Sequence, residues 1–248
     1  MIDAINVSKS GMVSSQNWLD TISHNLSNIQ TEGYKRKFVN FESVINSASS
    51  EGRFSGLGSS SGDALTSFDS GDVRGTGREL DVYLDGSGFF EVITPNNEIG
   101  YTKNGRLVIG NDRSLSLIGG SQFTDMIFVP ENVLSVEINT QGKVFGVLSA
   151  DESVELGELS QFTFTNPEYL EEHGSGIYLE SAKSGRASAI DIDDQRFGRV
   201  NQGYIELSNV KLVDEMSNLM LAQRTYQMNA RVLQAADQIL ETINNIRR

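Results

Sequence analysis

The end of the chain reads NVKLVDEMSNLMLAQRTYQMNARVLQAADQILETINNIRR over residues 209–248 and contains neither glycine nor proline. A large side chain recurs every seven residues in this stretch, at Leu212, Leu219, Tyr226, Leu233 and Leu240. Further apolar side chains follow three residues after members of that set, at Ala222, Ala236 and Ile243. This spacing predicts one long amphipathic helix with an apolar stripe that a small domain cannot bury alone. Ser208 or Asn209 can cap its start.

A weaker form of the same pattern occupies the start of the chain. Apolar residues recur every seven positions at Ile5, Met12, Leu19 and Leu26, and Ile22 and Ile29 follow the last two by three residues. The pattern predicts a second heptad helix, although serines weaken its first half. Gly33 is a natural residue for a left-handed turn after the helix, with a positive φ angle. We expect the two helices to pack together, or against copies of themselves in adjacent subunits.

The middle of the chain has the pattern of short strands and turns. Between Leu80 and Ile192 apolar and polar residues alternate in short runs. Asp85-Gly86, Asn104-Gly105 and Gln141-Gly142 mark the turns between successive runs. Repeated hairpin signals with no helix between them predict an all-β domain.

The stretch from Glu42 to Gly77 has a different composition, because serine and glycine crowd together in it. Such a composition is typical of a flexible segment. Four apolar residues, Phe54, Leu57, Leu65 and Phe68, would be unnecessary in a plain linker. We predict an inter-subunit clamp that is mobile in the monomer and ordered in a polymer. An unstructured spacer is the alternative.

The sequence therefore predicts an α+β fold in which paired, coiled-coil-like terminal helices flank a central all-β domain. The predicted segments are an N-terminal assembly helix (1–34), a Ser/Gly-rich extended segment (35–79), the central β-domain (80–195), a return linker (196–207) and a C-terminal assembly helix (208–248).

Charge and composition exclude several classes of function. The chain has a net charge of −13, whereas residues 1–41 and 208–248 each carry +1, so the middle carries −15. This charge argues against nucleic acid as a partner, because phosphate binding needs clustered Lys and Arg. The absence of cysteine excludes disulfides and thiolate metal sites. No apolar run is long enough to predict membrane insertion, and we expect no cleaved signal peptide.

No residue pattern predicts a catalytic, cofactor or metal site. Asp81 and Asp85 flank an alternating strand and are interpreted as solvent-facing rather than as a glycosidase pair. The acidic group at Asp191, Asp193 and Asp194 lacks the glycine and glutamate spacing of a calcium loop. The histidines, His24 and His173, have no neighbour at metal spacing.

The terminal motifs resemble those of bacterial flagellar rod and hook proteins. In HNLSNIQTEGYKR, residues 24–36, the resemblance rests on Asn25, Asn28, Thr31, Gly33, Tyr34, Lys35 and Arg36. The C-terminal stretch 208–243 is similar to the C-terminal helix of that family. GTGRELDVYLDGSGFFEV (75–92) and YTKNGRLVI (101–109) resemble its shared β-domain. FTFTNPEYLEEHGSGIYLES (162–181), followed by Ser184-Gly185, is most similar to the distal rod branch.

This resemblance implies a structural subunit that polymerises into a tubular drive shaft and transmits motor torque to the hook. It implies type III export, a rod that spans the periplasm, and terminal helices that line the inner tube. The implied partners are other copies, other rod proteins, the hook protein and the L/P-ring bushing. The proximal rod protein of the same family is an alternative. A secreted β-rich enzyme or binding module is another, but it would not need apolar stripes at both ends.

Overall fold

The computed structural model describes residues 2–46, 55–149, 152–192, 194 and 196–246. The chain divides into two compact units. The helical unit contains Met1–Ile29, Lys37–Leu65 and Val210–Arg248, and the β unit contains Gln30–Arg36 and Thr66–Asn209. The short segment after the first helix therefore belongs to the β unit, although its neighbours on both sides belong to the helical unit.

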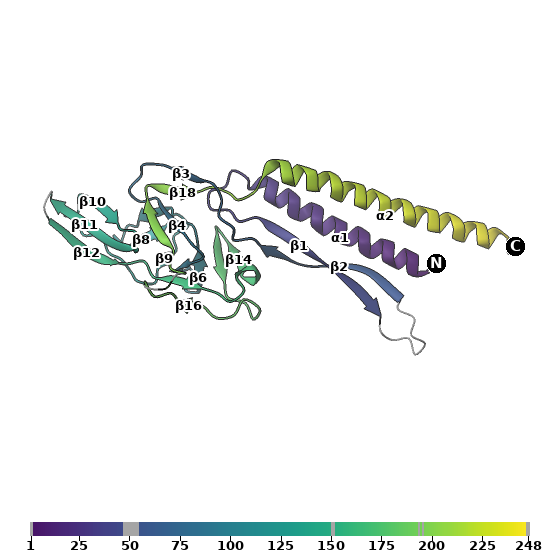
Figure 1. The fold of residues 1–248 in the computed structure, drawn as a ribbon, viewed down its shortest axis with the longest axis horizontal. Helices are drawn as coiled ribbons and strands as arrows, with labels where there is room; N and C mark the ends of the chain where they lie inside the picture. The colour runs from purple at the N-terminus through teal and green to yellow at the C-terminus, as the bar shows by residue number, and fades with distance from the viewer. Residues whose placement is uncertain (1, 47–54, 150–151, 193, 195, 247–248) are drawn as a thin grey trace. The chain divides into compact units, whose positions relative to one another are not determined.

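Among the described residues, the α-helices are α1 (Ile2–Ser27) and α2 (Leu212–Ile246), which lie side by side in the helical unit (Figure 1). Both terminal helices were predicted from the heptad spacing, and their presence is confirmed. Asp214 and Glu215 lie in the first turn of α2, where negative charge interacts favourably with the helix dipole. The uninterrupted length of α2 follows from the absence of glycine and proline.

Two strands lie in the Ser/Gly-rich stretch that the sequence suggested to be flexible. β1 (Lys37–Asn46) pairs with β2 (Ser55–Thr66), and β1 also contacts α1. The prediction of a flexible loop is therefore wrong for residues 42–46 and 55–66, which lie in these strands. Serine and glycine do not prevent a strand when the inward-facing backbone N–H and C=O groups pair across the ribbon.

The β unit is built from several short sheets. The largest runs in the order β14-β15-β6-β5-β9-β8-β7, and β13 joins it through β5 and also pairs with β16. Separate pairings are β10-β11-β12, β17-β4 and β18-β3. The described strands are β3 (Val73–Gly75), β4 (Val82–Asp85), β5 (Phe89–Ile93), β6 (Ile99–Thr102), β7 (Leu107–Ile109), β8 (Leu115–Leu117), β9 (Gln122–Phe123), β10 (Ser135–Ile138), β11 (Lys143–Ser149), β12 (Glu152–Glu158), β13 (Gln161–Thr163), β14 (Glu171–Gly174), β15 (Ile177–Leu179), β16 (Ser188–Ala189), β17 (Arg199–Gln202) and β18 (Tyr204–Glu206). A short 3₁₀ helix, η1 (Pro167–Tyr169), precedes β14.

One apolar core joins these sheets. Phe90, Val92, Leu115 and Val144 are almost completely buried and belong to the same cluster, although they come from β5, β8 and β11. A second, aromatic cluster contains Phe89, Tyr101, Phe164, Leu170 and Tyr178. Burying each large apolar side chain contributes about 1.5–3 kcal/mol. The β-rich middle predicted from the sequence is confirmed, with a complete core of its own.

The strand connections differ in part from the predicted hairpins. Gln141-Gly142 does separate the antiparallel strands β10 and β11. Asn104-Gly105 does not form a hairpin, because β6 pairs with β5 and β15 whereas β7 pairs with β8. A Cβ at Gly105 would lie 1.8 Å from the carbonyl oxygen of Val82, so this glycine permits a close backbone contact instead. The expected return linker at 196–207 contains β17 and β18.

Candidate assembly interface

Small side chains fill the contact between α1 and α2. Ser8 and Ser15 on α1 and Ala222 and Ala236 on α2 are buried. A Cβ at Gly11 would lie 2.8 Å from Nδ2 of Asn229, so α2 comes close to the α1 backbone there. The contact thus depends on close approach of two helices rather than on large interlocking apolar side chains.

The residues predicted to form the assembly interface divide into three groups by exposure. Ile22 is buried. A half-buried group consists of Ile5, Met12, Leu19, Leu26, Ile29, Leu219, Tyr226 and Leu233. Leu212, Leu240 and Ile243 are exposed, so the structure places them outside the contact between the helices.

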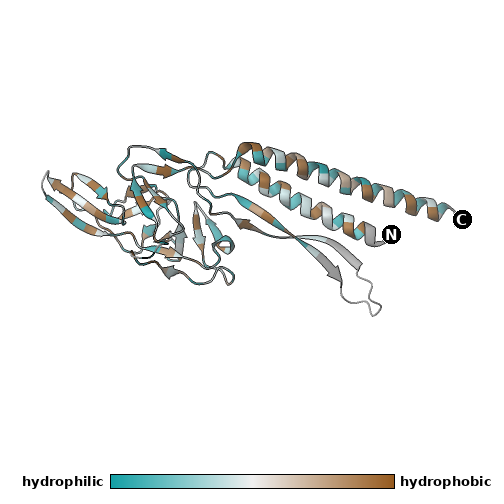
Figure 2. Ribbon diagram, in the orientation of Figure 1, coloured by the Kyte–Doolittle hydropathy of each residue, from teal (hydrophilic) through white to brown (hydrophobic). Residues whose placement is uncertain are grey.

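Exposed apolar side chains also extend along α2, and we call this set the outer stripe. Its exposed residues are Val213, Met216, Met220, Leu221, Met228, Val232, Ile239 and Ile243. By helical periodicity Val213, Met220, Leu221 and Met228 lie on the side of α2 that faces away from Glu215 and Ala222. Val232, Ile239 and Ile243 lie beside Ala236 in the helical repeat, at spacings of four, three and seven residues, and are exposed near the end of α2. Apolar (brown) positions accordingly recur along the whole of α2 in Figure 2. Of these residues the sequence analysis selected only Ile243. The spacings Leu221–Met228 and Val232–Ile239, seven residues each, could have revealed the stripe.

Asn25 connects three elements of the helical unit. Its Nδ2 donates to the carbonyl oxygen of Lys37 at 2.7 Å, and its Oδ1 accepts from the Lys37 backbone N–H at 2.9 Å. Nδ2 also lies 3.4 Å from Oε2 of Glu215, a completely buried residue on α2. This arrangement fixes the start of β1 against α1 and sets the position of α2 relative to both. Asn28, the next motif residue, caps its own helix by donating to the carbonyl oxygen of His24.

The ribbon of β1 and β2 is held against α1 mainly by polar groups. Ser14 Oγ donates to the carbonyl oxygen of Ser59 at 3.1 Å, and Asn17 Nδ2 donates to Ser61 Oγ at 2.7 Å. The rings of Trp18 and Phe41 meet edge to face with centroids 5.7 Å apart. These contacts explain why the ribbon follows the helix.

The predicted clamp residues have different surroundings. Leu65 is buried, and Phe68 packs edge to face against Phe89 and Tyr178, so both contribute to packing within the chain. Leu57 lies in β2, and Phe54 lies outside the described residues.

The motif residues Thr31–Arg36 form a turn that docks into the β unit, which we call the motif turn. Gly33 has φ = +70°, which confirms the predicted positive angle, and its N–H donates to the carbonyl oxygen of Glu206 at 2.9 Å. Tyr34 is buried, and its carbonyl oxygen accepts from the N–H of Asn209. The Arg36 N–H donates to Oδ1 of Asn209 at 2.6 Å. Thr31 is exposed.

A buried ion pair lies beneath the motif turn. Lys35 Nζ donates to Glu206 Oε1 at 2.7 Å and to the carbonyl oxygen of Asp69 at 2.9 Å. The Gly71 N–H donates to the same carboxylate oxygen at 2.7 Å. The two charged side chains are only 1% and 5% exposed, so the additional hydrogen bonds are needed to offset their desolvation.

Glu32 of the motif turn forms two further ion pairs, which are more exposed than the Lys35–Glu206 pair. Its carboxylate accepts from Arg74 and Arg106, each at 2.6 Å. Because Arg74 and Arg106 are both partly exposed, we expect this contact to weaken with added salt.

A second buried lysine lies near the pair. Lys103 Nζ donates to the carbonyl oxygen of Gly86 at 2.7 Å and lies 5.4 Å from the centre of the Phe89 ring. Burial, and secondarily the positive charge of Lys35, lower the pKa of Lys103 to about 8. Glu206, Asp69 and Asp85 oppose this shift.

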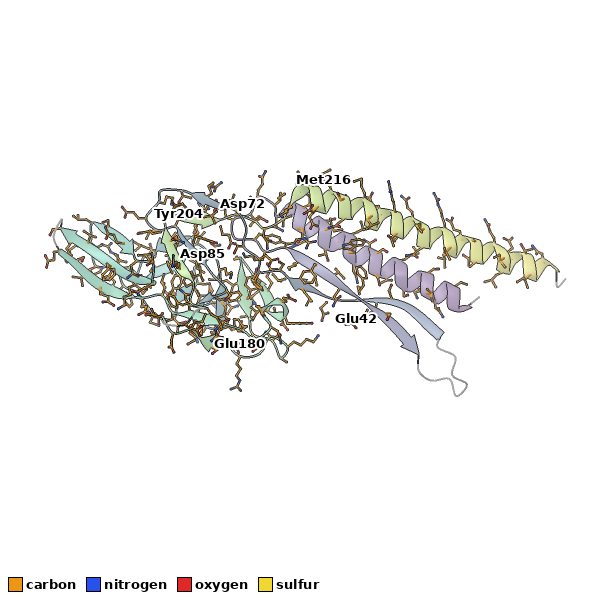
Figure 3. All side chains as sticks on the ribbon, in the orientation of Figure 1. Glu42, Asp72, Asp85, Glu180, Tyr204 and Met216 are labelled. Atoms are coloured by element: carbon orange, nitrogen blue, oxygen red, sulfur yellow. The ribbon has the colours of Figure 1, made fainter. Side chains whose placement is uncertain are left out.

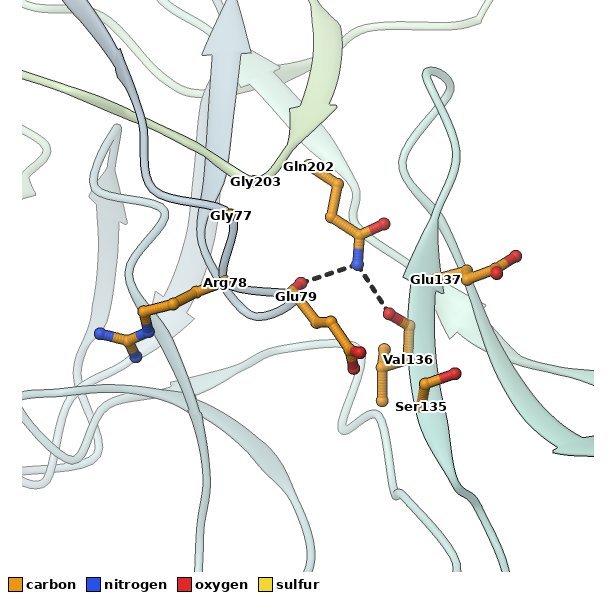
Figure 4. Close-up of a pocket in the computed structure, with 8 residues that line it drawn as sticks. All are labelled: Gly77, Arg78, Glu79, Ser135, Val136, Glu137, Gln202 and Gly203. Atoms are coloured by element: carbon orange, nitrogen blue, oxygen red, sulfur yellow. Dashed lines mark hydrogen bonds between the residues drawn. The ribbon is translucent and has the colours of Figure 1, made fainter.

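A groove of about 280 Å³ lies elsewhere in the β unit (Figure 4). Gln202 crosses it: Nε2 donates to the carbonyl oxygens of Glu79 and Val136, and Oε1 accepts from the Ile138 N–H. The amide thus pairs with the outer edge of β10 as a backbone peptide would, and connects β17 to that strand. Gly77, Arg78, Ser135, Glu137 and Gly203 complete the lining.

The described residues contain no group of three or more His, Asp or Glu side chains arranged to hold a metal ion.

Asp81 was expected to face solvent, but it is buried and forms a β-bridge with Arg106. Asp85 is exposed at the end of β4. The burial of Asp81 follows from the pairing of residues 80–82 with 105–107. In the part of the chain that the structure describes, no helix combines the length and the hydropathy needed to cross a membrane.

Three family descriptions match successive parts of the chain. Residues 5–35 match the flagella basal body rod protein, residues 83–146 the D1 domain of the flagellar hook protein FlgE/F/G, and residues 201–246 the C-terminal region of the flagellar basal body rod FlgEFG protein. The matches thus cover α1 with the motif turn, the centre of the β unit, and β18 with α2.

Whole-length relatives have the same assignment. The flagellar basal-body rod protein FlgG of Borreliella burgdorferi is 32% identical over 264 aligned positions, which cover 100% of both chains. That of Bacillus subtilis is 32% identical, with 96% of this chain and 97% of the relative covered. That of Caulobacter vibrioides is 28% identical over 99% of this chain. The chain therefore belongs to the bacterial flagellar basal-body rod family, in the branch of the distal rod protein FlgG, and is a structural subunit rather than an enzyme.

Proposed function

We propose that this distal rod subunit polymerises through the outer stripe of α2, which packs against the helices of neighbouring copies. The supporting observation is the row of exposed apolar side chains that extends along α2 from Val213 to Ile243. A monomer that stays in water gains nothing from such a row, because apolar surface is stabilised by burial. The near-neutral charge of residues 208–248 also favours close approach of copies, since little like-charge repulsion opposes it.

The resulting polymer would be a tubular drive shaft that transmits torque to the hook. Residues selected from the sequence fit this proposal in two ways. Leu212, Leu240 and Ile243 are exposed and available to a second copy, whereas Ile22, Ala222 and Ala236 hold α1 and α2 together. Other rod proteins, the hook protein and the ring bushing remain the proposed partners at the ends and around the shaft. Export through the flagellar type III apparatus remains the proposed route.

Substitution of a charge into the outer stripe tests the proposal. Val232→Asp places a carboxylate in the stripe, and Ile118→Asp places the same carboxylate at an exposed apolar position of the β unit. Both variants should keep the circular dichroism spectrum and unfolding midpoint of the wild type within error. Only Val232→Asp should lose polymers in electron micrographs and motility in cells. Normal polymers from Val232→Asp, or equal loss from both variants, would show that α2 does not assemble through this side.

We also propose that the ribbon of β1 and β2 stiffens the polymer by contacting a neighbouring copy. Its contacts with α1, through Ser14, Asn17 and Trp18, keep it beside the assembling helix. Deleting residues 47–61, which removes part of β2, should leave polymerisation intact but produce shorter, curved or fragile rods. Rods of unchanged straightness and strength would favour a plain spacer instead.

A further inference from the structure

Three of the six methionines lie on the outer stripe of α2. Met216, Met220 and Met228 are 51%, 54% and 66% exposed, so solvent reaches each of them in the monomer. Figure 3 shows Met216 on the side of α2 away from α1. Their spacing of four and eight residues keeps them within one broad side of the helix. This apolar surface is therefore rich in sulfur as well as hydrophobic.

We propose that these three thioethers form a modification site, at which oxidation by a peroxide prevents the free subunit from joining the polymer. The inference rests on the proposed function, because it assumes that the outer stripe is the surface through which copies pack. It adds a chemical means by which assembly through that surface can be blocked and restored.

The chemistry needs one peroxide molecule for each methionine. The sulfur lone pair attacks the terminal oxygen of hydrogen peroxide, an S–O bond forms as the O–O bond breaks, and water leaves after proton transfer. Sulfur is oxidised by two electrons, and the peroxide is reduced by two. The product is methionine sulfoxide, a polar group with a strong hydrogen-bond acceptor, which methionine sulfoxide reductases convert back to the thioether.

The consequence for packing follows from desolvation. A thioether adapts its shape to an apolar neighbour and loses little by leaving water. A sulfoxide oxygen that is buried without a donor loses its hydrogen bonds to water. By helical spacing Val213 lies beside Met216 and Val232 beside Met228, whereas Arg224 lies between Met220 and Met228. Where a second copy packs its own apolar side chains against these sulfur atoms, a sulfoxide oxygen would have no donor.

The same geometry predicts protection in the polymer. Once a second copy covers the stripe, the three sulfur atoms are no longer accessible to peroxide. Oxidation would then discriminate between subunits that have not yet assembled and those already incorporated.

Met126 provides a matched control within the chain. It is 54% exposed, as is Met220, but it lies in the β unit, between β9 and β10. Its oxidation should be as fast as that of the stripe residues and should leave assembly unchanged.

The experiment uses the full-length monomer with hydrogen peroxide as the probe. Oxidised methionines are located by peptide mass spectrometry, and the critical concentration for polymerisation is measured by sedimentation. Oxidised wild type and oxidised Met126→Leu should both show a critical concentration raised roughly tenfold or more, since each lost apolar contact is worth about one decade. The triple variant Met216→Leu/Met220→Leu/Met228→Leu should be unaffected by peroxide. Preformed polymers should oxidise at Met126 but not at the three stripe positions.

A second measurement applies if the triple variant does not fold. Treating oxidised wild type with methionine sulfoxide reductase should then restore its original critical concentration. Wild type that carries oxygen on all three methionines and polymerises normally would overturn the proposal, as would monomer in which peroxide does not reach them. Failure of the underlying function gives a different result, because untreated Val232→Asp would then polymerise like the wild type.

Discussion

The two compact units of the chain bury different kinds of side chain. In the β unit, Phe90, Val92 and Leu115 are each at most 1% exposed and belong to one continuous apolar core. In the helical unit, Ser15 and Glu215 are among the buried residues, whereas large apolar side chains line the outer side of α2. The β unit thus has a complete core in the monomer. The apolar surface of the helical unit is still exposed.

Because of this difference, we expect the β unit to determine the stability of the monomer and the helical unit to determine assembly of the polymer. Substitutions in the β core should change the free energy of unfolding of the monomer, because they remove contacts already made. Substitutions on the outer stripe should change the monomer little and the polymer strongly, because the contacts they remove form only between copies. The motif turn should also affect the stability of the monomer, since its buried charges are already paired there.

The largest expected difference in monomer stability is between two single alanine variants, one in the β core and one on α2. Phe90→Ala removes a ring that is 1% exposed and should destabilise the β unit by about 3–5 kcal/mol. Ile239→Ala removes a side chain that is about half exposed and should change monomer stability by no more than about 0.5 kcal/mol. Urea denaturation of the two monomers measures the difference. Comparable losses would mean that α2 is already covered in the monomer.

The second largest loss of monomer stability should come from breaking the buried ion pair under the motif turn. Glu206→Leu leaves the Lys35 ammonium buried without its carboxylate and should cost about 3 kcal/mol or more. Lys35→Met combined with Glu206→Leu should recover much of that loss, because two apolar side chains need no partner. Glu32→Leu is the control, since its arginine partners are partly exposed and its loss should cost about 1 kcal/mol or less. A double variant no more stable than Glu206→Leu would contradict this account.

Lys103 gives the β unit a pH dependence that the helical unit should lack. Its pKa in the folded state is about 8, below the ordinary value of 10.5, so the unfolded chain holds the proton more tightly. The contribution of Lys103 to stability should therefore be least favourable below pH 8 and should rise between pH 8 and 10.5, by up to about 3 kcal/mol. Lys103→Met should abolish this rise and stabilise the protein at neutral pH. Parallel pH profiles for the variant and the wild type would assign the dependence to another group.

The sequence was most informative about regular elements. Both helices follow from heptad spacing, and the short alternating runs with glycine turns indicated the β-rich middle. The exact contacts between α1 and α2 did not follow from this spacing. A hydrophobic pattern identifies large side chains, whereas this contact is centred on Ser8, Gly11 and Ser15, whose small size lets α2 approach.

Contacts between residues far apart in the chain could not be predicted from the sequence pattern either. Asn104-Gly105 has the composition of a hairpin turn, but its glycine is required by the nearby backbone of Val82. Likewise Lys35 and Glu206 are far apart in the chain, and neither carries a local signal of burial. Only the fold brings these two residues together. The sequence therefore identified the motif residues around Lys35, but it could not predict that Glu206 is the partner of Lys35.

Gly33 provides the smallest test, and it separates backbone strain from crowding. A Cβ at this position would lie 3.5 Å from the nearest atom, Cβ of Asn104, which is ordinary van der Waals contact. Steric overlap therefore predicts no penalty, whereas φ = +70° disfavours a β-branched residue. Gly33→Val should destabilise the motif turn by about 1–2 kcal/mol. Gly33→Asn should cost distinctly less, because asparagine tolerates the left-handed region. Thermal unfolding of the two variants beside wild type decides the matter: equal losses for valine and asparagine would mean that lost space, and not backbone conformation, is the reason for a glycine here.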